Sequence, residues 1–243
     1  MKLLIVVPSY GGVSPGTNQG LVALSGAMDK LAAARLKRLG VEDYTWLFID
    51  GWGLAPKQND AFKKVLEHDC DAVLSIETDI TFMPRHVARL VESYTEKATL
   101  GPCMVGALYP SSSAPNTVVG SLRASDEPHA RGPMTAAETA FLEDAFDREA
   151  VLPAWCVGMG FTIFGRPLVE QMVALHRYPF EEPLDDTEEA GLVTSDTIIC
   201  QRVRAAGMEI YADLGCQVGH SVKLTMTIAD LIGSERARKR AAQ

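Results

Sequence analysis

The stretch "LSIETDITF", from Leu74 to Phe82, determines how the fold is interpreted. It continues the apolar run "DAVLSI", which is typical of a strand buried on both faces. Two carboxylates, Glu77 and Asp79, follow where this strand leaves the core. Ligands of parallel α/β sheets bind beyond the carboxyl ends of the strands. The stretch therefore predicts a buried strand followed by a polar site.

Strand and helix patterns alternate around this stretch. Apolar runs predict strands at 3–7, 44–50, 72–76 and 103–109, and helical spacing predicts helices at 17–39, at 56–68 and from 84 onward. Further along, a Gly-rich turn and short strand follow residue 157, then helices at 167–175 and 195–206, and a strand from 208 to His220. The alternation predicts an α/β fold with a mostly parallel central sheet flanked by helices.

Composition limits the class of protein. The chain has 243 residues, of which 47% are hydrophobic and 22% charged, as in ordinary soluble globular proteins. The formal net charge of −8 argues against a broad nucleic-acid surface, which needs clustered Lys and Arg. Five cysteines without a CxxC pair argue against a disulfide framework or a structural zinc site. The first apolar run is too short for a signal peptide, and no stretch is long enough to span a membrane, so we expect a cytoplasmic protein.

The order of several short motifs resembles the GT-A glycosyltransferases, especially the family two type and its phage-associated relatives. The motifs are "VVPSY", the Asp of "LFID", "KQN" in place of Arg-Asn, "ETD" in place of DXD, "GMGFTIFGR", and then Asp196, Arg202, Gly207 and His220 at family-like offsets. Two departures stand out: the DXD-like motif begins with Glu, and the family's "ED" is "SD" here, so only Asp196 of that pair remains.

The resemblance implies a site with four kinds of residue. It assigns Pro8, Ser9, Tyr10, Asp50, Asn59, Glu77, Thr78 and Asp79 to nucleotide-sugar binding, Trp155, Gly158, Gly160, Asp185 and Asp186 to the acceptor side, Asp79, His220 and Glu77 to the metal, and Asp196 to the catalytic base. Oxygen ligands with one imidazole suit Mn²⁺ or Mg²⁺. A cation would also offset the repulsion between this acidic protein and donor phosphates.

The resemblance further implies a single domain over 1–243. Residues 1–110 would be the nucleotide-sugar half, 111–153 a variable insertion, 154–224 the acceptor and catalytic half, and 225–243 a basic tail. The implied reaction moves a sugar from a nucleotide-diphosphate sugar to a hydroxyl acceptor, which could be a saccharide, a lipid, a small molecule or a modified base. A homo-oligomer is compatible with the sequence.

Alternatives remain open for several residues and for the function. Asp196 could be only a helix cap, with Asp185 or Asp186 as base, or a retaining reaction could need no base. Trp155 could be a core residue. The tail could be a solvated helix end or an anchor for an acidic surface. A non-catalytic nucleotide- or sugar-binding protein, a nucleotidyltransferase and a DNA-modifying transferase are the alternative functions.

Overall fold

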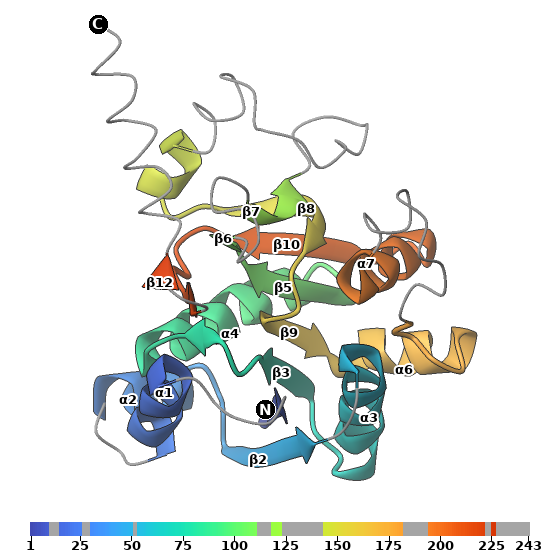
Figure 1. The fold of residues 1–243 in the computed structure, drawn as a ribbon, viewed down its shortest axis with the longest axis horizontal. Helices are drawn as coiled ribbons and strands as arrows, with labels where there is room; N and C mark the ends of the chain where they lie inside the picture. The colour runs from blue at the N-terminus through green and yellow to red at the C-terminus, as the bar shows by residue number, and fades with distance from the viewer. Residues whose placement is uncertain are drawn as a thin grey trace, which may run out of the picture.

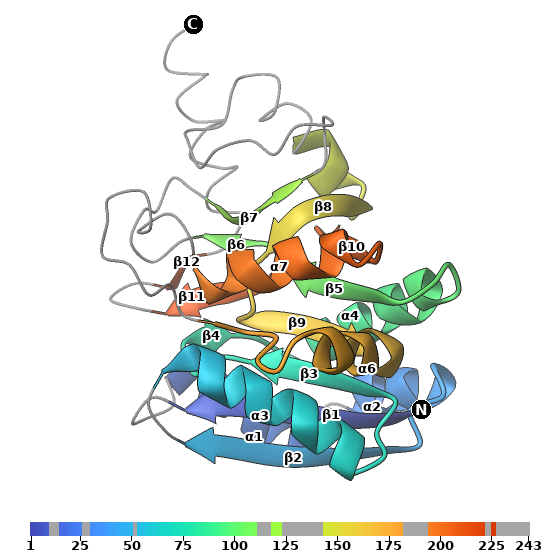
Figure 2. The same ribbon diagram turned by 90° about the vertical axis from the view of Figure 1, so that its right-hand side faces the viewer.

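A computed structural model describes residues 1–9, 15–25, 30–50, 53–110, 118–122, 143–181, 194–221 and 225–226. Within them, a nine-stranded sheet has helices on both faces, which confirms the predicted α/β class (Figures 1 and 2). The order of the sheet is β2-β1-β3-β9-β5-β10-β8-β7-β6. Its strands are β1 (Lys2–Ser9), β2 (Asp43–Asp50), β3 (Ala72–Ile76), β5 (Cys103–Ala107), β6 (Tyr109–Pro110), β7 (Val118–Leu122), β8 (Val151–Val157), β9 (Phe161–Gly165) and β10 (Glu209–Asp213).

The helices divide between the two faces of the sheet. Helices α1 (Pro15–Ser25), α2 (Lys30–Arg38) and α4 (Pro84–Ala98) cover one face, and α3 (Leu54–Glu67), α6 (Arg166–Leu175) and α7 (Ser195–Ala205) cover the other (Figure 2). Strand β1 contributes Leu3 and Ile5 to one core and Leu4 and Val6 to the other. Alternate side chains of a strand point to opposite faces, so a continuous apolar run is what a doubly covered strand requires.

Strand β9 is the reversed strand in the middle of the sheet. Strands β2, β1 and β3 run parallel, as do β5 and β10, whereas β9 pairs antiparallel with both β3 and β5. Because of this reversal, Phe161 at the start of β9 lies beside Ile76 at the end of β3. The Gly-rich turn at 158–160 is thereby placed at the carboxyl edge of the parallel strands.

Three details differ from the predicted elements. The helix predicted at 17–39 is two helices, α1 and α2, on either side of residues 26–29, which lie outside the described ranges. Within 111–153, β7 and the start of β8 extend the main sheet. The single strand predicted at 208–220 is two strands in two sheets, because β10 ends at Asp213 and β11 (Gly219–Ser221) pairs with β4 (Ile80–Thr81) and β12 (Thr225–Met226).

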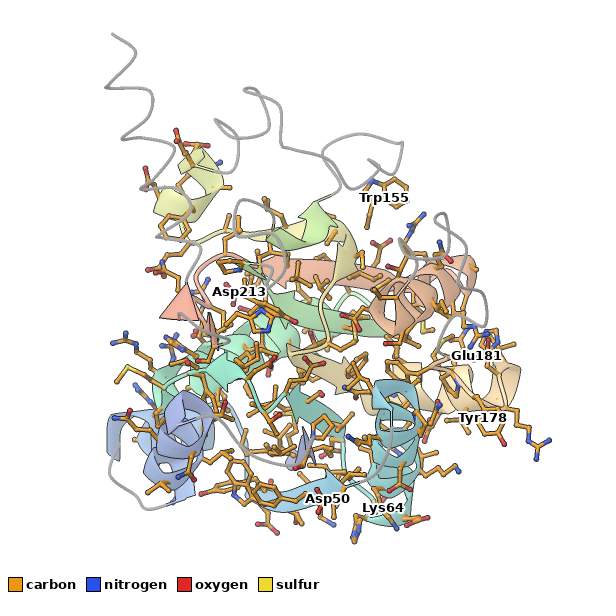
Figure 3. The ribbon with its side chains drawn as sticks, in the orientation of Figure 1. Asp50, Lys64, Trp155, Tyr178, Glu181 and Asp213 are labelled. Carbon is orange, nitrogen blue, oxygen red and sulfur yellow. The ribbon has the colours of Figure 1, made fainter. Side chains whose placement is uncertain are left out.

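Asp213 explains why β10 ends where it does. Its fully buried carboxylate accepts hydrogen bonds from Nε of Arg89 at 3.0 Å, from the Ser93 hydroxyl at 2.5 Å and from the Gly215 amide at 2.9 Å. A buried carboxylate is tolerated when its charge is paired and its oxygens accept hydrogen bonds. The bond to Gly215 turns the chain out of the main sheet. Figure 3 labels Asp213 in this region.

Among the helices that the structure describes, none combines the length and the apolar character needed to cross a bilayer.

His86 gives the fold a predicted acid sensitivity. Its Nδ1 accepts the Met83 amide hydrogen at the start of α4, and burial, followed by the charge of Arg85, lowers its pKa to about 4. The unfolded chain, with an ordinary histidine pKa, then binds more protons than the folded chain, so stability falls as the pH drops toward 4. Between about pH 7 and pH 5 we expect the wild type to lose up to about 2 kcal/mol through His86.

The variant His86→Gln tests this expectation. Gln at this helix position can still accept the Met83 amide hydrogen but does not titrate. Urea unfolding at both pH values should show a smaller pH dependence in the variant. An equal loss of stability in the two proteins would show that other groups cause the acid sensitivity.

Candidate active site at the carboxyl edge of the sheet

The predicted polar positions gather at the carboxyl ends of β1, β2 and β3. Ser9 and Asp50 are register partners at the ends of β1 and β2, and Glu77 directly follows β3. The Glu77 amide donates to the Gly160 carbonyl at 2.9 Å, which joins the Gly-rich turn to the same edge. Asp50 is exposed and Ser9 partly exposed, so this end of the edge is open to a ligand. Figure 3 shows Asp50 at the end of β2.

Asp79 and His220 form the closest pair of the predicted metal ligands. Nε2 of His220 lies 2.9 Å from Oδ2 of Asp79, although the residues are 141 positions apart. Pairing of β11 with β4 aligns His220 with Ile80, and the Ser221 amide donates to the Asp79 carbonyl at 2.6 Å. The Asp79 side chain is 44% exposed and His220 11%, so the carboxylate faces outward from a largely covered imidazole.

The hydrogen bonds of His220 determine which ring nitrogen carries a proton. Nδ1 lies 3.0 Å from the Pro110 carbonyl oxygen, which can only accept, so Nδ1 is protonated. Nε2 therefore faces the Asp79 carboxylate with either a second proton or a lone pair. Burial lowers the pKa of His220, but the hydrogen bond and charge of Asp79 and the Pro110 carbonyl outweigh burial, and the pKa is raised. A second proton on Nε2 satisfies this arrangement, and a cation bound to both groups is the alternative.

Glu77 carries a buried oxygen that the rest of the site leaves unsatisfied. Its Oε1 is buried and has no hydrogen-bond partner among the described residues, although the residue as a whole is partly exposed. Burial first, and then the negative charges of Asp196 and Asp79, raise the pKa of Glu77 well above its ordinary value. The three carboxyl groups therefore lie close enough to interact. An orphaned buried oxygen among carboxylates is the kind of group that a ligand donor or cation would satisfy.

Asp196 lies in the first turn of α7, and the helix is capped by its neighbour. The Thr194 hydroxyl accepts the Thr197 amide hydrogen at 3.4 Å, which is the N-cap interaction. Oδ2 of Asp196 instead accepts the Met159 amide hydrogen of the Gly-rich turn at 3.3 Å. The Asp196 carboxylate thus points toward the Gly-rich turn at the sheet edge. Thr194, and not Asp196, provides the N-cap hydrogen bond of α7.

Tyr109 is a central residue of the site that the sequence analysis did not identify. Its hydroxyl accepts the Gly160 amide hydrogen at 2.8 Å, and its ring packs edge-on against His220 with centroids 5.4 Å apart. A Cβ on Gly158 or Gly160 would overlap the Tyr109 hydroxyl, so the glycines are needed for this packing. Burial first, and then Glu77 and Asp196, raise the pKa of Tyr109. Its place at the end of the fourth predicted strand was the available signal.

A side chain of α1 supports the loop that carries Thr78. The Thr17 hydroxyl lies 2.9 Å from the Thr78 carbonyl oxygen and 2.6 Å from that of Ile80. Thr78 is 7% exposed. These contacts fix the backbone between Glu77 and Asp79. Pro8 is buried in β1, and the Ser9 carbonyl accepts a hydrogen bond from the buried ammonium of Lys57.

Asn59 and Arg202 both hold the segment 178–181. The Asn59 amide donates to the Phe180 carbonyl at 2.7 Å and accepts from the Phe180 amide at 2.9 Å, in the protein interior. Arg202 donates to the carbonyls of Tyr178 and Pro179 and pairs with Glu181 at 2.8 Å. Figure 3 labels Tyr178 and Glu181 beside α6. These two motif residues therefore hold the chain just before the segment that contains Asp185 and Asp186.

Trp155 lies away from the edge just described. Its ring is 9% exposed, and the Arg204 guanidinium of α7 stacks on it at 3.7 Å from the centroid. In Figure 3 it lies at the opposite end of the view from Asp50. Trp155 is therefore covered by Arg204, and its predicted role on the acceptor side stays a prediction. Tyr10, Asp185 and Asp186 lie outside the described residues.

Of the three residues predicted to bind a metal, Asp79 and His220 are in contact with each other, and metal binding itself stays a prediction. In the described part of the chain, no group of three or more His, Cys, Asp or Glu side chains is arranged to hold a metal ion. Asp79 and His220 supply one carboxylate and one imidazole, 2.9 Å apart. Magnesium sites commonly use one or two carboxylates and take the other ligands from substrate phosphates and water.

Comparisons with known proteins bear on the fold. No family model matches the sequence, and no curated protein matches it. The solved structure of A197 from STIV is similar, with a TM-score of 0.55 and 14% identity over 93% of this chain and 90% of that one. This likeness shows a shared fold.

Two further structures are more distant. CMP:2-keto-3-deoxy-manno-octonic acid synthetase complexed with CTP has a TM-score of 0.43 and 14% identity, covering 100% of this chain and 99% of that one. UDP-glucose pyrophosphorylase complexed with UDP-glucose has a TM-score of 0.46 and 9% identity, covering 99% and 100%.

Proposed function

We propose that this protein is a metal-dependent glycosyltransferase that moves a sugar from a nucleotide-diphosphate sugar to a hydroxyl acceptor. The observation that carries the proposal is the Asp79–His220 pair, held at 2.9 Å at the carboxyl edge of the sheet beside Glu77 and Asp196. The motif order that resembles GT-A glycosyltransferases supports it, because five residues of that order lie at this edge: Ser9, Asp50, Glu77, Asp79 and His220.

Asp79 and His220 would hold Mn²⁺ or Mg²⁺ between them. A bound divalent cation would stabilise the negative charge that develops on the departing diphosphate. The Pro110 carbonyl fixes the His220 ring so that Nε2 points at this position. Pairing of β11 with β4 fixes the distance between the two ligands.

Asp196 would accept the proton of the acceptor hydroxyl in an inverting transfer. The Met159 amide binds Oδ2 and holds the carboxylate toward the site. The Gly-rich turn that supplies this amide is in turn fixed by Tyr109 and by the Glu77 amide. The base and the metal ligands are therefore connected through one network of described residues.

A ligand screen tests the proposed function. Thermal shifts measured with UDP, GDP, CDP and ADP, each with and without Mn²⁺, should show one nucleotide that stabilises the protein more strongly when Mn²⁺ is present. The matching nucleotide sugar should then release nucleoside diphosphate slowly in water. Binding without any turnover would favour a non-catalytic binding protein, and release of pyrophosphate from a nucleoside triphosphate and a sugar phosphate would favour a nucleotidyltransferase.

Asp50→Ala should weaken nucleoside diphosphate binding about tenfold both with and without Mn²⁺. Its exposed carboxylate ends β2 beside Ser9 and would accept hydrogen bonds from the nucleobase or ribose. Isothermal titration calorimetry measures the effect. Asp43→Ala, an exposed carboxylate at the other end of the same strand, is the matched control and should bind normally. If Asp50→Ala lowered only the Mn²⁺-dependent part of the affinity, the assignment of Asp50 to the nucleobase or ribose would be wrong.

A further inference from the structure

Two of the five cysteines meet between β8 and α7, directly behind Asp196. The thiols of Cys156 and Cys200 each lie 3.7 Å from the same carbonyl oxygen, that of Val157. Besides burial, the Cys156 thiol also contributes to the raised pKa of Cys200, as a neighbouring thiol does. Cys156 additionally lies 3.9 Å from the Asp196 carbonyl oxygen. The pair therefore lies in the contact between strand β8 and helix α7, which also includes apolar packing and the stacking of Arg204 on Trp155.

The other cysteines lack this arrangement. Cys70, Cys103 and Cys216 are buried, and the thiols of Cys70 and Cys216 lie near backbone carbonyls of His68 and His86. Cys156 is the one cysteine of the five that is partly exposed. A small oxidant in solution can therefore reach Cys156, with Cys200 buried immediately behind it.

We propose that Cys156 and Cys200 are a redox-responsive pair that a peroxide converts to a disulfide between β8 and α7. In the first step the Cys156 thiolate attacks the peroxide, which leaves a sulfenic acid on Cys156 and releases an alcohol or water. In the second step the Cys200 sulfur displaces the hydroxyl group of the sulfenic acid, and the thiol proton leaves with it as water. Two thiols are oxidised and one peroxide is reduced, so the step balances.

The surroundings of the two thiols indicate which cysteine is oxidised first and which one then forms the disulfide. Burial first, and then the neighbouring Cys156 thiol, raise the pKa of Cys200 well above its ordinary value. A buried thiol with a raised pKa is a poor nucleophile toward a peroxide in solution, so the accessible Cys156 is oxidised first. Cys200 then attacks the sulfenic acid and gives up its proton to the departing hydroxyl group as the disulfide forms.

The cross-link would act on the contact that orients Asp196. Cys156 precedes Met159 by three positions, and Met159 donates its amide hydrogen to Asp196. Cys200 follows Asp196 by four positions and so lies one helical turn along the same face of α7. A disulfide between the two cysteines would fix the spacing of α7 and β8 next to the hydrogen bond between Met159 and Asp196. An effect of this disulfide on sugar transfer rests on the proposed function, whereas formation of the disulfide does not.

Thiol counting tests the proposal without any substrate. The native protein is treated with hydrogen peroxide, quenched and denatured, and its free thiols are titrated. We expect five free thiols in the reduced protein and three after oxidation, with a peptide map that links the segments containing Cys156 and Cys200. Retention of five thiols, a sulfinic acid on Cys156 without a cross-link, or disulfide-linked dimers would overturn the proposal.

Matched variants identify the pair and separate it from the proposed enzyme activity. Cys156→Ser and Cys200→Ser should each abolish the loss of two thiols, and Cys103→Ser should not. A bifunctional alkylating reagent of disulfide-like span should bridge the wild-type pair, which reports proximity even where a Ser variant folds poorly. With an identified donor, oxidation should lower turnover several-fold, reversibly with a thiol reductant. A cross-link without a change in turnover would contradict the regulatory role while leaving the thiol pair established.

Discussion

Asp196→Asn is expected to lower turnover by about a hundredfold or more while nucleotide binding and melting temperature stay close to wild type. Asn preserves the size of the side chain and can still accept the Met159 amide hydrogen, but it cannot take up the acceptor proton. Helix stability should change little, because Thr194 rather than Asp196 provides the N-cap hydrogen bond. Steady-state transfer with the identified donor and acceptor measures the effect on turnover.

Thr194→Ala is the control for this experiment. Removing the cap should lower the free energy of unfolding by about 1 kcal/mol and leave turnover within a few-fold of wild type. The two variants therefore separate chemistry from stability at two positions in the first turn of one helix. If Asp196→Asn retained turnover within a few-fold of wild type, Asp185, Asp186 or a retaining mechanism would be the better account.

Asp79→Ala is expected to abolish the part of nucleotide affinity that depends on Mn²⁺. The substitution removes the exposed carboxylate of the pair and leaves His220 as a single neutral ligand, which is too weak a site for a hard cation. Calorimetric titration of the best nucleotide with and without Mn²⁺ measures this difference. His220→Ala should act in the same direction, because it removes the other member of the pair.

Asp144→Ala is the matched control for Asp79. Asp144 is an exposed carboxylate that pairs with Arg148, remote in sequence from the site, so its removal should leave Mn²⁺-dependent binding intact. The circular dichroism spectrum of Asp79→Ala should match wild type, since β4 and β11 are held by backbone pairing and by the Thr81–Ser221 hydroxyl contact. Undiminished Mn²⁺-dependent binding in Asp79→Ala would contradict the metal assignment.

The sequence by itself determined the α/β class, most of the elements and the edge at which polar residues gather. Apolar runs such as the one in β1 are local signals, and so are the helix ends at Gly40 and Gly207, where φ is +77° and +74°. Local signals depend only on neighbouring residues, and they could therefore be read without knowing which strands pair.

Only the tertiary structure decided which of these residues meet. The predicted final strand divides at Asp213, so that β11 leaves the main sheet and brings His220 against Asp79. The reversal of β9 places the Gly-rich turn beside Glu77, and Tyr109 fills the space that the two glycines leave. Strand order and register depend on contacts between residues distant in the chain, and no local pattern of side chains specifies such partners.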